Sequence, residues 1–199
     1  FNSRVEEVLL RRKRVERGLA ERVTSAEWDD GVIRTNYFDL SQLMDYWGPA
    51  RLNHHTEATS MLYALREGLR LVLEEGLEAR FKRHLRHEAA LMAGLEAMGL
   101  SLYGERENKL IPVTAVSIPA GIDGEAVRAM LLNDFDIEIA SSFGPLKGKI
   151  WRIGTMGYSG LQKNVLHVLG ALEAVLIRCG AKVNAGKAVQ AALDVYHDK

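Results

Sequence analysis

The sequence predicts a chain of mixed α/β class, in which helices pack on a small, mostly antiparallel sheet. Two consecutive long segments, residues 56–76 and 77–98, carry apolar residues at helical spacing. After them the pattern changes to short, alternating, β-branched segments interleaved with further helical ones. Helices followed by this mixture of strands and helices are typical of an α+β or open α/β layered arrangement.

The first part of the chain is expected to be helical with one loop. Residues 4–22 are rich in arginine and glutamate and have the apolar spacing of a surface helix. Residues 24–31 are polar and acidic, which favours a loop. Asp39 and Gln42 fit a capping box that starts a short helix, and this helix should stop before Gly48.

The two long helices have recognisable ends. Thr56 is a candidate N-cap of the first, because its hydroxyl can accept a hydrogen bond from a free backbone N–H of the first turn. Gly76 is a plausible C′ glycine at its other end, and Gly99 ends the second helix.

The remaining residues predict strands between helices. Residues 112–118 are β-branched and alternating, and 137–140 and 149–154 supply two more strand candidates. Asp123 starts a capped helix between the first two strands. A helix over 159–178 and a short final one close the chain.

Composition and charge exclude several classes of partner. Lys plus Arg and Asp plus Glu both total 26, so no basic surplus points to nucleic acid or to an anionic membrane. No apolar run approaches the ~20 residues that span a bilayer, and no signal peptide opens the chain. The single cysteine, Cys179, favours a packed thiol in a reducing compartment. We therefore expect a cytoplasmic protein with no nucleic-acid or membrane partner.

The first residue is Phe1 rather than methionine, and it leads into a charged amphipathic segment with no preceding strand. The sequence is therefore expected to be truncated at its N-terminus.

Two sets of residues invite a functional interpretation that their spacing does not support. His84, His87 and Glu88 match neither H-E-x-x-H nor H-x-x-E-H, and the arginines around them would repel a cation, so a solvated helix face is favoured over a metal site. The glycines between Gly144 and Gly160 do not form the G-x-G-x-x-G fingerprint of a dinucleotide site, and they are expected to serve turns.

Two other positions leave alternatives open. Arg152 stands in the alternating apolar segment K-I-W-R-I-G, where its side chain either faces solvent or meets an anion, and the residues alone favour solvent. In His54-His55-Thr56 the threonine either caps a helix or helps to bind a phosphate at the helix N-terminus. Spacing does not choose between these readings.

These segments together resemble the class V pyridoxal-phosphate aminotransferases of the alanine–glyoxylate and serine–glyoxylate type. The resemblance runs through W-G-P-A-R-L-N-H-H-T, Y-A-L-R-E-G-L and F-D-I-E-I-A-S-S-F-G-P-L-K-G-K-I-W-R-I-G-T-M-G, and it covers the chain beyond about Asn36. It looks closest to the (S)-ureidoglycine–glyoxylate aminotransferases of bacterial purine breakdown, through N-H-H-T-E-A-T and W-R-I-G-T-M-G-Y. It implies the C-terminal portion of the type I fold of pyridoxal-phosphate enzymes.

The resemblance implies roles for three residues. Arg152 matches the family arginine that grips the substrate carboxylate. Thr56 would help to hold the phosphate of the cofactor, pyridoxal 5'-phosphate, of the neighbouring subunit in a homodimer. Asn53 stands where alanine–glyoxylate relatives have tyrosine, and its amide can donate and accept hydrogen bonds, as a ureido group requires.

The chain also departs from the family pattern. The Schiff-base lysine, the aspartate at the pyridine nitrogen and the ring-stacking aromatic precede this segment in the family, so no catalytic residue is expected here and the chain alone should be inert. Residues 1–75 would be the end of the large domain with its interface helices, and 76–199 the small C-terminal domain.

The function implied by the resemblance is transfer of the amino group of (S)-ureidoglycine to glyoxylate, which gives glycine. The rival enzymes are serine–glyoxylate and alanine–glyoxylate aminotransferases. The rival from another class is a catalytically dead dimerisation module.

Overall fold

The structure, a computed structural model, describes residues 2–11, 37–49, 51 and 53–198. It divides into two compact units, residues 1–66 and 67–199, and each unit is described by itself. The division falls inside helix α3, Thr59–Glu75. The assignment of residues 1–75 to a large domain stays a prediction. The expected loop over 24–31 lies outside the described residues, as does the second half of the first expected helix.

The first unit contains a helix at the start of the predicted 4–22 helix and the short helix predicted after Asp39. Helix α1 spans Ser3–Arg11 and α2 spans Leu40–Trp47. The carboxylate of Asp39 caps α2 by accepting a hydrogen bond from the backbone N–H of Ser41 at 3.0 Å, and the side-chain amide of Gln42 donates to the same carboxylate at 3.2 Å. The predicted N-terminus of this helix and its end before Gly48 are confirmed.

The start of α3 corrects one prediction. The carbonyl oxygen of Ala58 accepts the first helical hydrogen bond, from Leu62 at 3.1 Å, so Ala58 rather than Thr56 occupies the N-cap position. The reason is a tight turn before the helix. The carbonyl oxygen of Glu57 accepts from both the backbone N–H and the hydroxyl of Thr59, and the helix starts two residues later than predicted.

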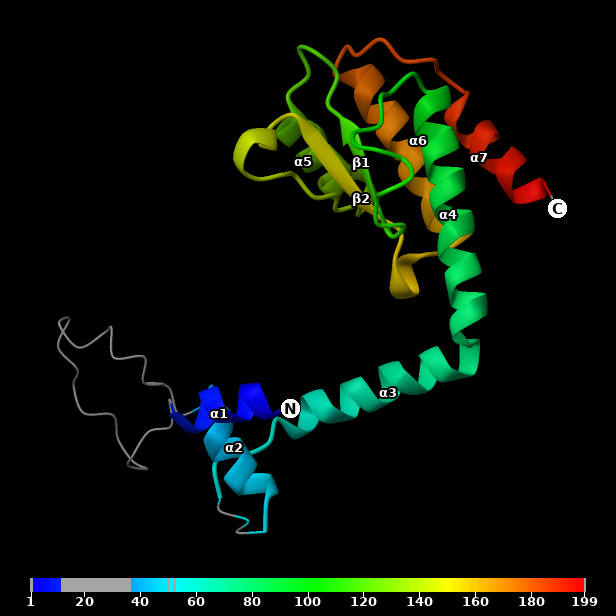
Figure 1. The fold of residues 1–199 in the computed structure, drawn as a ribbon. Coiled ribbons are helices and arrows are strands. Elements are labelled where there is room, and N and C mark those ends of the chain that lie inside the picture. Colours follow the sequence, from blue (N-terminus) through cyan, green and yellow to red (C-terminus); the bar gives the residue numbers. More distant parts are fainter. Residues whose placement is uncertain (1, 12–36, 50, 52, 199) are drawn as a thin grey trace, which may run out of the picture. The chain divides into compact units, whose positions relative to one another are not determined.

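The second unit packs helices around a two-stranded sheet (Figure 1). Its helices α4, α6 and α7 contact one another, α5 contacts α6, and α4 also contacts strand β1. None of the described helices is both long and apolar enough to cross a membrane. The elements of this unit beyond α3 are α4 (Leu77–Ala97), β1 (Val113–Ser117), α5 (Gly124–Phe135), the 3-10 helix η2 (Gly144–Leu146), β2 (Ile150–Gly154), the 3-10 helix η3 (Gly157–Ser159), α6 (Gln162–Arg178) and α7 (Ala188–His197).

Strands β1 and β2 pair antiparallel with Ala115 opposite Arg152, which confirms two predicted strands and the predicted direction of pairing. The third predicted strand, 137–140, is wrong as a strand. Only Ala140 pairs, by exchanging two backbone hydrogen bonds with Arg152 at 2.8 and 3.0 Å. The segment follows directly on the C-cap of α5, where the backbone N–H of Ile137 donates to the carbonyl of Leu131 at 3.0 Å, so it makes a bridge and not a ladder. The carbonyl of Ile139 accepts from the side chain of Arg128.

The core of this unit lies between the helices and the sheet. Trp151 is fully buried, and its indole N–H donates to the carbonyl of Gly124 at 3.0 Å. Gly94 lets α4 approach its neighbours closely, because a Cβ there would lie 2.4 Å from the side chain of Leu169 and 2.9 Å from the carbonyl oxygen of Ala188. Cys179 packs partly buried against this core.

His87 corrects the prediction of a solvated helix face. It is 7% exposed, and its Nδ1 lies 2.7 Å from the hydroxyl of Tyr196 on α7. The packing of α4 against α7, which the local sequence pattern did not contain, buries this side. Burial, aided by the positive charges of Arg83 and Arg86, lowers the pKa of His87 below 6.5.

This lowered pKa predicts a loss of stability on mild acidification. The unfolded chain takes up a proton near pH 6.5 whereas folded His87 resists it, so its contribution is complete above that pH and declines as the pH falls toward the folded pKa. We expect the free energy of urea unfolding to fall between about pH 8 and about pH 5.5, and to fall less in a His87→Gln variant, which cannot titrate. An equal decline in both proteins would contradict the assignment.

Candidate functional site

Arg152 lies in the middle of β2, between Trp151 and Ile153, whose side chains are buried in the core. Because side chains alternate along a strand, Arg152 points away from the face that these two residues share. Its side chain is half-buried rather than solvated. The interpretation that the residues alone favoured, a solvent-facing arginine, is therefore incomplete.

Two contacts orient the guanidinium of Arg152. Its Nε donates a hydrogen bond to the carbonyl oxygen of Ser141 at 2.9 Å. Its central carbon lies 5.2 Å from the centre of the Phe143 ring, within range of a cation–π interaction. Among the described residues no hydrogen-bond acceptor pairs with the two terminal nitrogens. The planar fork that binds a carboxylate is thus held in place and left available.

These residues line a cavity of about 410 Å³, which is within the size range of small-molecule sites. Two arginines, Arg128 and Arg152, give it positive charge, while Glu138 and the half-buried Ser141 add polar groups. Arg128 pairs with Glu125, whereas Arg152 has no acidic partner among the described ion pairs. The cavity therefore suits a small acid at Arg152. Its lining consists of Arg128, Glu138, Ile139, Ala140, Ser141, Phe143 and Arg152.

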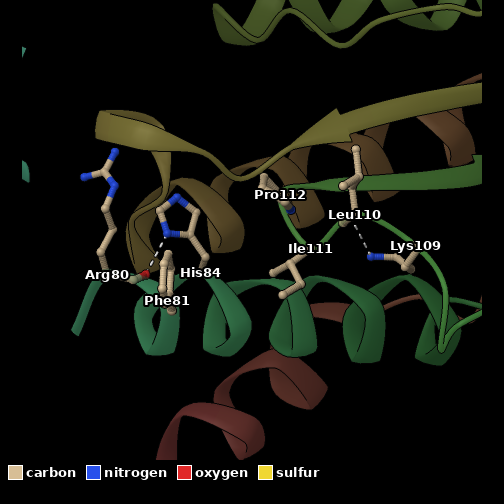
Figure 2. Close-up of a pocket in the computed structure, with 7 residues that line it drawn as sticks. All are labelled: Arg80, Phe81, His84, Lys109, Leu110, Ile111 and Pro112. Atoms are coloured by element: carbon tan, nitrogen blue, oxygen red, sulfur yellow. Dashed lines mark hydrogen bonds between the residues drawn. The ribbon is translucent and has the colours of Figure 1, made fainter. Parts of the chain in front are cut away.

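A second cavity, of about 340 Å³, is mainly apolar (Figure 2). Its polar groups are already paired: Nδ1 of His84 contacts the carbonyl oxygen of Arg80 at 2.7 Å, and Lys109 pairs with the carboxylate of Glu88. Arg80 in turn pairs with Glu75 at 2.9 Å. This cavity therefore has fewer unpaired cationic groups for binding an anion than the cavity at Arg152 has.

An ionic cluster lies at the junction of α3 and α4. The carboxylate of Glu75 accepts hydrogen bonds from Arg83 and Arg80, which lower its pKa to about 2. Arg83 also donates to the carbonyl oxygens of Gly157 and Gly160, at 3.1 and 2.8 Å, in the loop that follows β2. The cluster therefore anchors the loop that follows the strand carrying Arg152.

The other two expected site residues belong to the first unit. Asn53 and Thr56 are both exposed there, on either side of a pair of histidines. Nδ1 of His54 and Nδ1 of His55 lie 2.7 Å apart, and His55 also lies 3.4 Å from the carboxylate of Glu57. The hydroxyl of Thr56 is thus accessible to a ligand. Arg152 belongs to the second unit.

The described residues fit pyridoxal phosphate only in part. A threonine hydroxyl such as that of Thr56 can hold a phosphate oxygen, and Arg152 can hold a substrate carboxylate. Lys109, a lysine that lines a cavity, is 17% exposed, and its amine is engaged in an ion pair with Glu88. Thr56 and Arg152 could therefore serve the phosphate and the substrate.

Of the seven residues that line this cavity, sequence reasoning singled out only Arg152 as a site residue; Arg128, Ser141 and Phe143 are among the six that it missed. Ser141 contributes a backbone carbonyl, for which side-chain identity gives no signal. The segment I-A-S-S-F-G-P, which contains Ser141 and Phe143 and is part of the family resemblance, could have indicated that these two residues lie near the site.

Comparison with known proteins gives consistent matches. No protein-family model matches the chain. The chain is 65% identical over 199 residues to the (S)-ureidoglycine–glyoxylate transaminase of Bacillus subtilis strain 168. The match includes all of this chain and 48% of that protein. It is 38% identical over 147 residues to the alanine–glyoxylate aminotransferase of Felis catus, with 72% of this chain and 36% of that protein covered.

A solved structure is also similar. The crystal structure of ureidoglycine–glyoxylate aminotransferase from Bacillus subtilis matches with a TM-score of 0.79 and 71% identity, over 82% of this chain and 42% of that one. The chain thus spans about half the length, or less, of the relatives it matches.

Proposed function

Because this chain belongs to the class V aminotransferases over its whole length, we propose that it serves in transferring the amino group of (S)-ureidoglycine to glyoxylate, which yields glycine, in purine breakdown. The observation that carries the proposal is the 65% identity to a ureidoglycine–glyoxylate transaminase, against 38% to an alanine–glyoxylate enzyme. The composition and the single cysteine favour the cytoplasm as its location.

In this proposal Arg152 binds the carboxylate that ureidoglycine and glyoxylate share. Its Nε is held by Ser141 and its face by Phe143, so the fork needs little ordering when the substrate binds. A bidentate pair of this kind fixes both the position and the direction of a small acid. The pair therefore also fixes the position of the reacting carbon, which is bonded to the carboxylate.

Pyridoxal phosphate, when bound, supplies the electron sink for amino transfer. We propose that Thr56 donates a hydrogen bond to its phosphate, in the neighbouring subunit of a homodimer, and that Asn53 hydrogen-bonds the ureido group of the donor. The exposure of both side chains supports these roles. The proposal also holds that this chain by itself is inactive, because the lysine that attaches the cofactor would lie in a segment preceding it.

A chimera tests the proposed function directly. In it, this chain replaces the matching segment of the Bacillus subtilis transaminase, to which it is 65% identical. We expect the chimera with pyridoxal phosphate to convert glyoxylate to glycine with ureidoglycine as donor, and the 199-residue chain alone to leave glyoxylate unconverted. Faster turnover with alanine or serine than with ureidoglycine would favour the rival aminotransferases. A folded chimera that retains the cofactor but transfers no amino group would contradict the proposal.

The role of Asn53 gives a prediction about the donor. An Asn53→Tyr substitution in the chimera removes an amide that can donate and accept at once, and so should weaken ureidoglycine more than glyoxylate. Losing one or two such hydrogen bonds corresponds to roughly a five- to thirtyfold drop in kcat/KM for ureidoglycine. The two half-reactions, measured separately by single turnover, check this. Equal losses for both substrates would argue against a contact with the ureido group.

A further inference from the structure

A second arginine, Arg128, lines the cavity at Arg152, and unlike Arg152 it pairs with an acidic side chain. Arg128 lies on α5, and its Nε donates to the carbonyl oxygen of Ile139 at 2.7 Å. One of its terminal nitrogens pairs with Glu125, one turn earlier on the same helix. The side chain is about one-quarter exposed. Through these two contacts it connects its own helix to the segment that runs beside β2.

The segment beside β2, residues 139–143, makes the contacts that hold Arg152. Ile139 is 4% exposed and belongs to the core. The next residue, Ala140, exchanges both backbone hydrogen bonds with Arg152, and the carbonyl of Ser141 accepts from the Nε of Arg152. Phe143 then lies beneath the guanidinium. Residues 139–143, named here the bridge segment, therefore contact Arg152 through backbone and side chain.

The bridge segment lacks the support of a sheet ladder. It meets β2 at the single pair Ala140–Arg152, and its flanking carbonyls at Ile139 and Ser141 each accept from an arginine Nε. The two arginines thus hold the same short segment at alternate residues. Because a site loses much of its effect when its geometry shifts by a fraction of an ångström, what fixes the bridge segment also fixes the fork of Arg152.

We propose that Arg128 is a positioning residue for Arg152: it fixes the bridge segment and so aligns the guanidinium with the substrate carboxylate. This inference rests on the proposed function, in which Arg152 binds that carboxylate. Arg128 itself does not touch the substrate. The hydrogen bond from Arg128 to Ile139 acts through the chain of contacts from Ala140 to Ser141 and Phe143.

A double-mutant cycle in the chimera tests the inference. Arg128→Met keeps the apolar stem and removes the donors, and should raise the KM for glyoxylate roughly tenfold, since a shift of about 1 Å in a site can cost up to a hundredfold. In an Arg152→Lys background the same substitution should add little, because there is no longer a fork to align. Arg128→Lys, which can still reach a carbonyl, should recover part of the effect. Arg178→Met, at an exposed ion pair on α6, is the matched control and should change nothing.

The 199-residue chain provides a readout that needs no activity. In the wild type the Nε–H of Arg152 should exchange slowly with water, because it is bonded to Ser141. In the Arg128→Met chain, or in Arg128→Lys if methionine prevents folding, this exchange should approach that of the exposed Arg106. An unchanged Arg152 signal, or a KM effect of Arg128→Met that persists undiminished beside Arg152→Lys, overturns the proposal. Failure of the wild-type chimera to use glyoxylate would count against the proposed function instead, since the exchange measurement does not depend on it.

Discussion

Replacing Arg152 by lysine in the chimera is expected to lower kcat/KM about ten- to a hundredfold for ureidoglycine and for glyoxylate alike. Lysine keeps the positive charge but loses the planar fork, so the carboxylate of each substrate loses a charge-assisted hydrogen bond. Such a bond is worth roughly 1.5–3 kcal/mol, which corresponds to that range of rates. Stopped-flow measurement of each half-reaction gives the two values.

The retention of pyridoxal phosphate should hardly change in the same variant, because Arg152 is assigned to the substrate and not to the cofactor. Arg178→Lys is the matched control. It makes the same chemical change at an exposed ion pair with Asp134, on the outer side of α6. A loss confined to one substrate, or an equal loss in the control, would mean that Arg152 does not hold the shared carboxylate.

Replacing Trp151 by alanine is expected to destabilise the chain by about 3–5 kcal/mol, a large part of the stability of a typical domain. The side chain is fully buried beneath the strand that carries Arg152, and its indole N–H satisfies the carbonyl of Gly124. Removing it leaves a cavity and breaks the hydrogen bond to α5. Urea unfolding of the 199-residue chain, followed by circular dichroism, measures the change.

Two variants separate the causes of that loss. Trp151→Phe keeps a ring in the core but removes the donor to Gly124, and should cost about 1–3 kcal/mol. Trp47→Ala removes the same side chain at a position that is 73% exposed, and should lie within about 0.5 kcal/mol of the wild type. A Trp151→Ala chain as stable as the Trp47→Ala chain would show that the described core is wrong.

The elements that local patterns determine were predictable from the sequence. Asp39 and Asp123 cap their helices with their own carboxylates, and α4 begins and ends within one residue of its predicted bounds. The predicted fold class, the C-terminal portion of a class V aminotransferase, is confirmed by the likeness to the Bacillus subtilis crystal structure. Periodicity and capping involve neighbours in the chain, and a single sequence contains that information.

The features that distant contacts determine were not predictable in this way. His87 is buried because Tyr196, more than a hundred residues later, packs on it. Residues 137–140 have the composition of a strand, but the segment begins in the C-cap of α5, where the backbone N–H of Ile137 donates to the carbonyl of Leu131, and only Ala140 pairs with β2. The environment of Arg152 depends on a backbone carbonyl and a ring that follow from the fold alone. Only the family resemblance made Arg152 the preferred candidate before the fold was known.

The most direct test of the account is a crystal structure of the chimera with pyridoxal phosphate and glyoxylate bound. If Arg152 binds the substrate carboxylate, both carboxylate oxygens of glyoxylate lie about 2.7–2.9 Å from its two terminal nitrogens. The Nε of Arg152 should still donate to Ser141, with Phe143 beneath the guanidinium, as in the structure described above. Glyoxylate held by other residues, with the fork of Arg152 directed into solvent, would contradict the account.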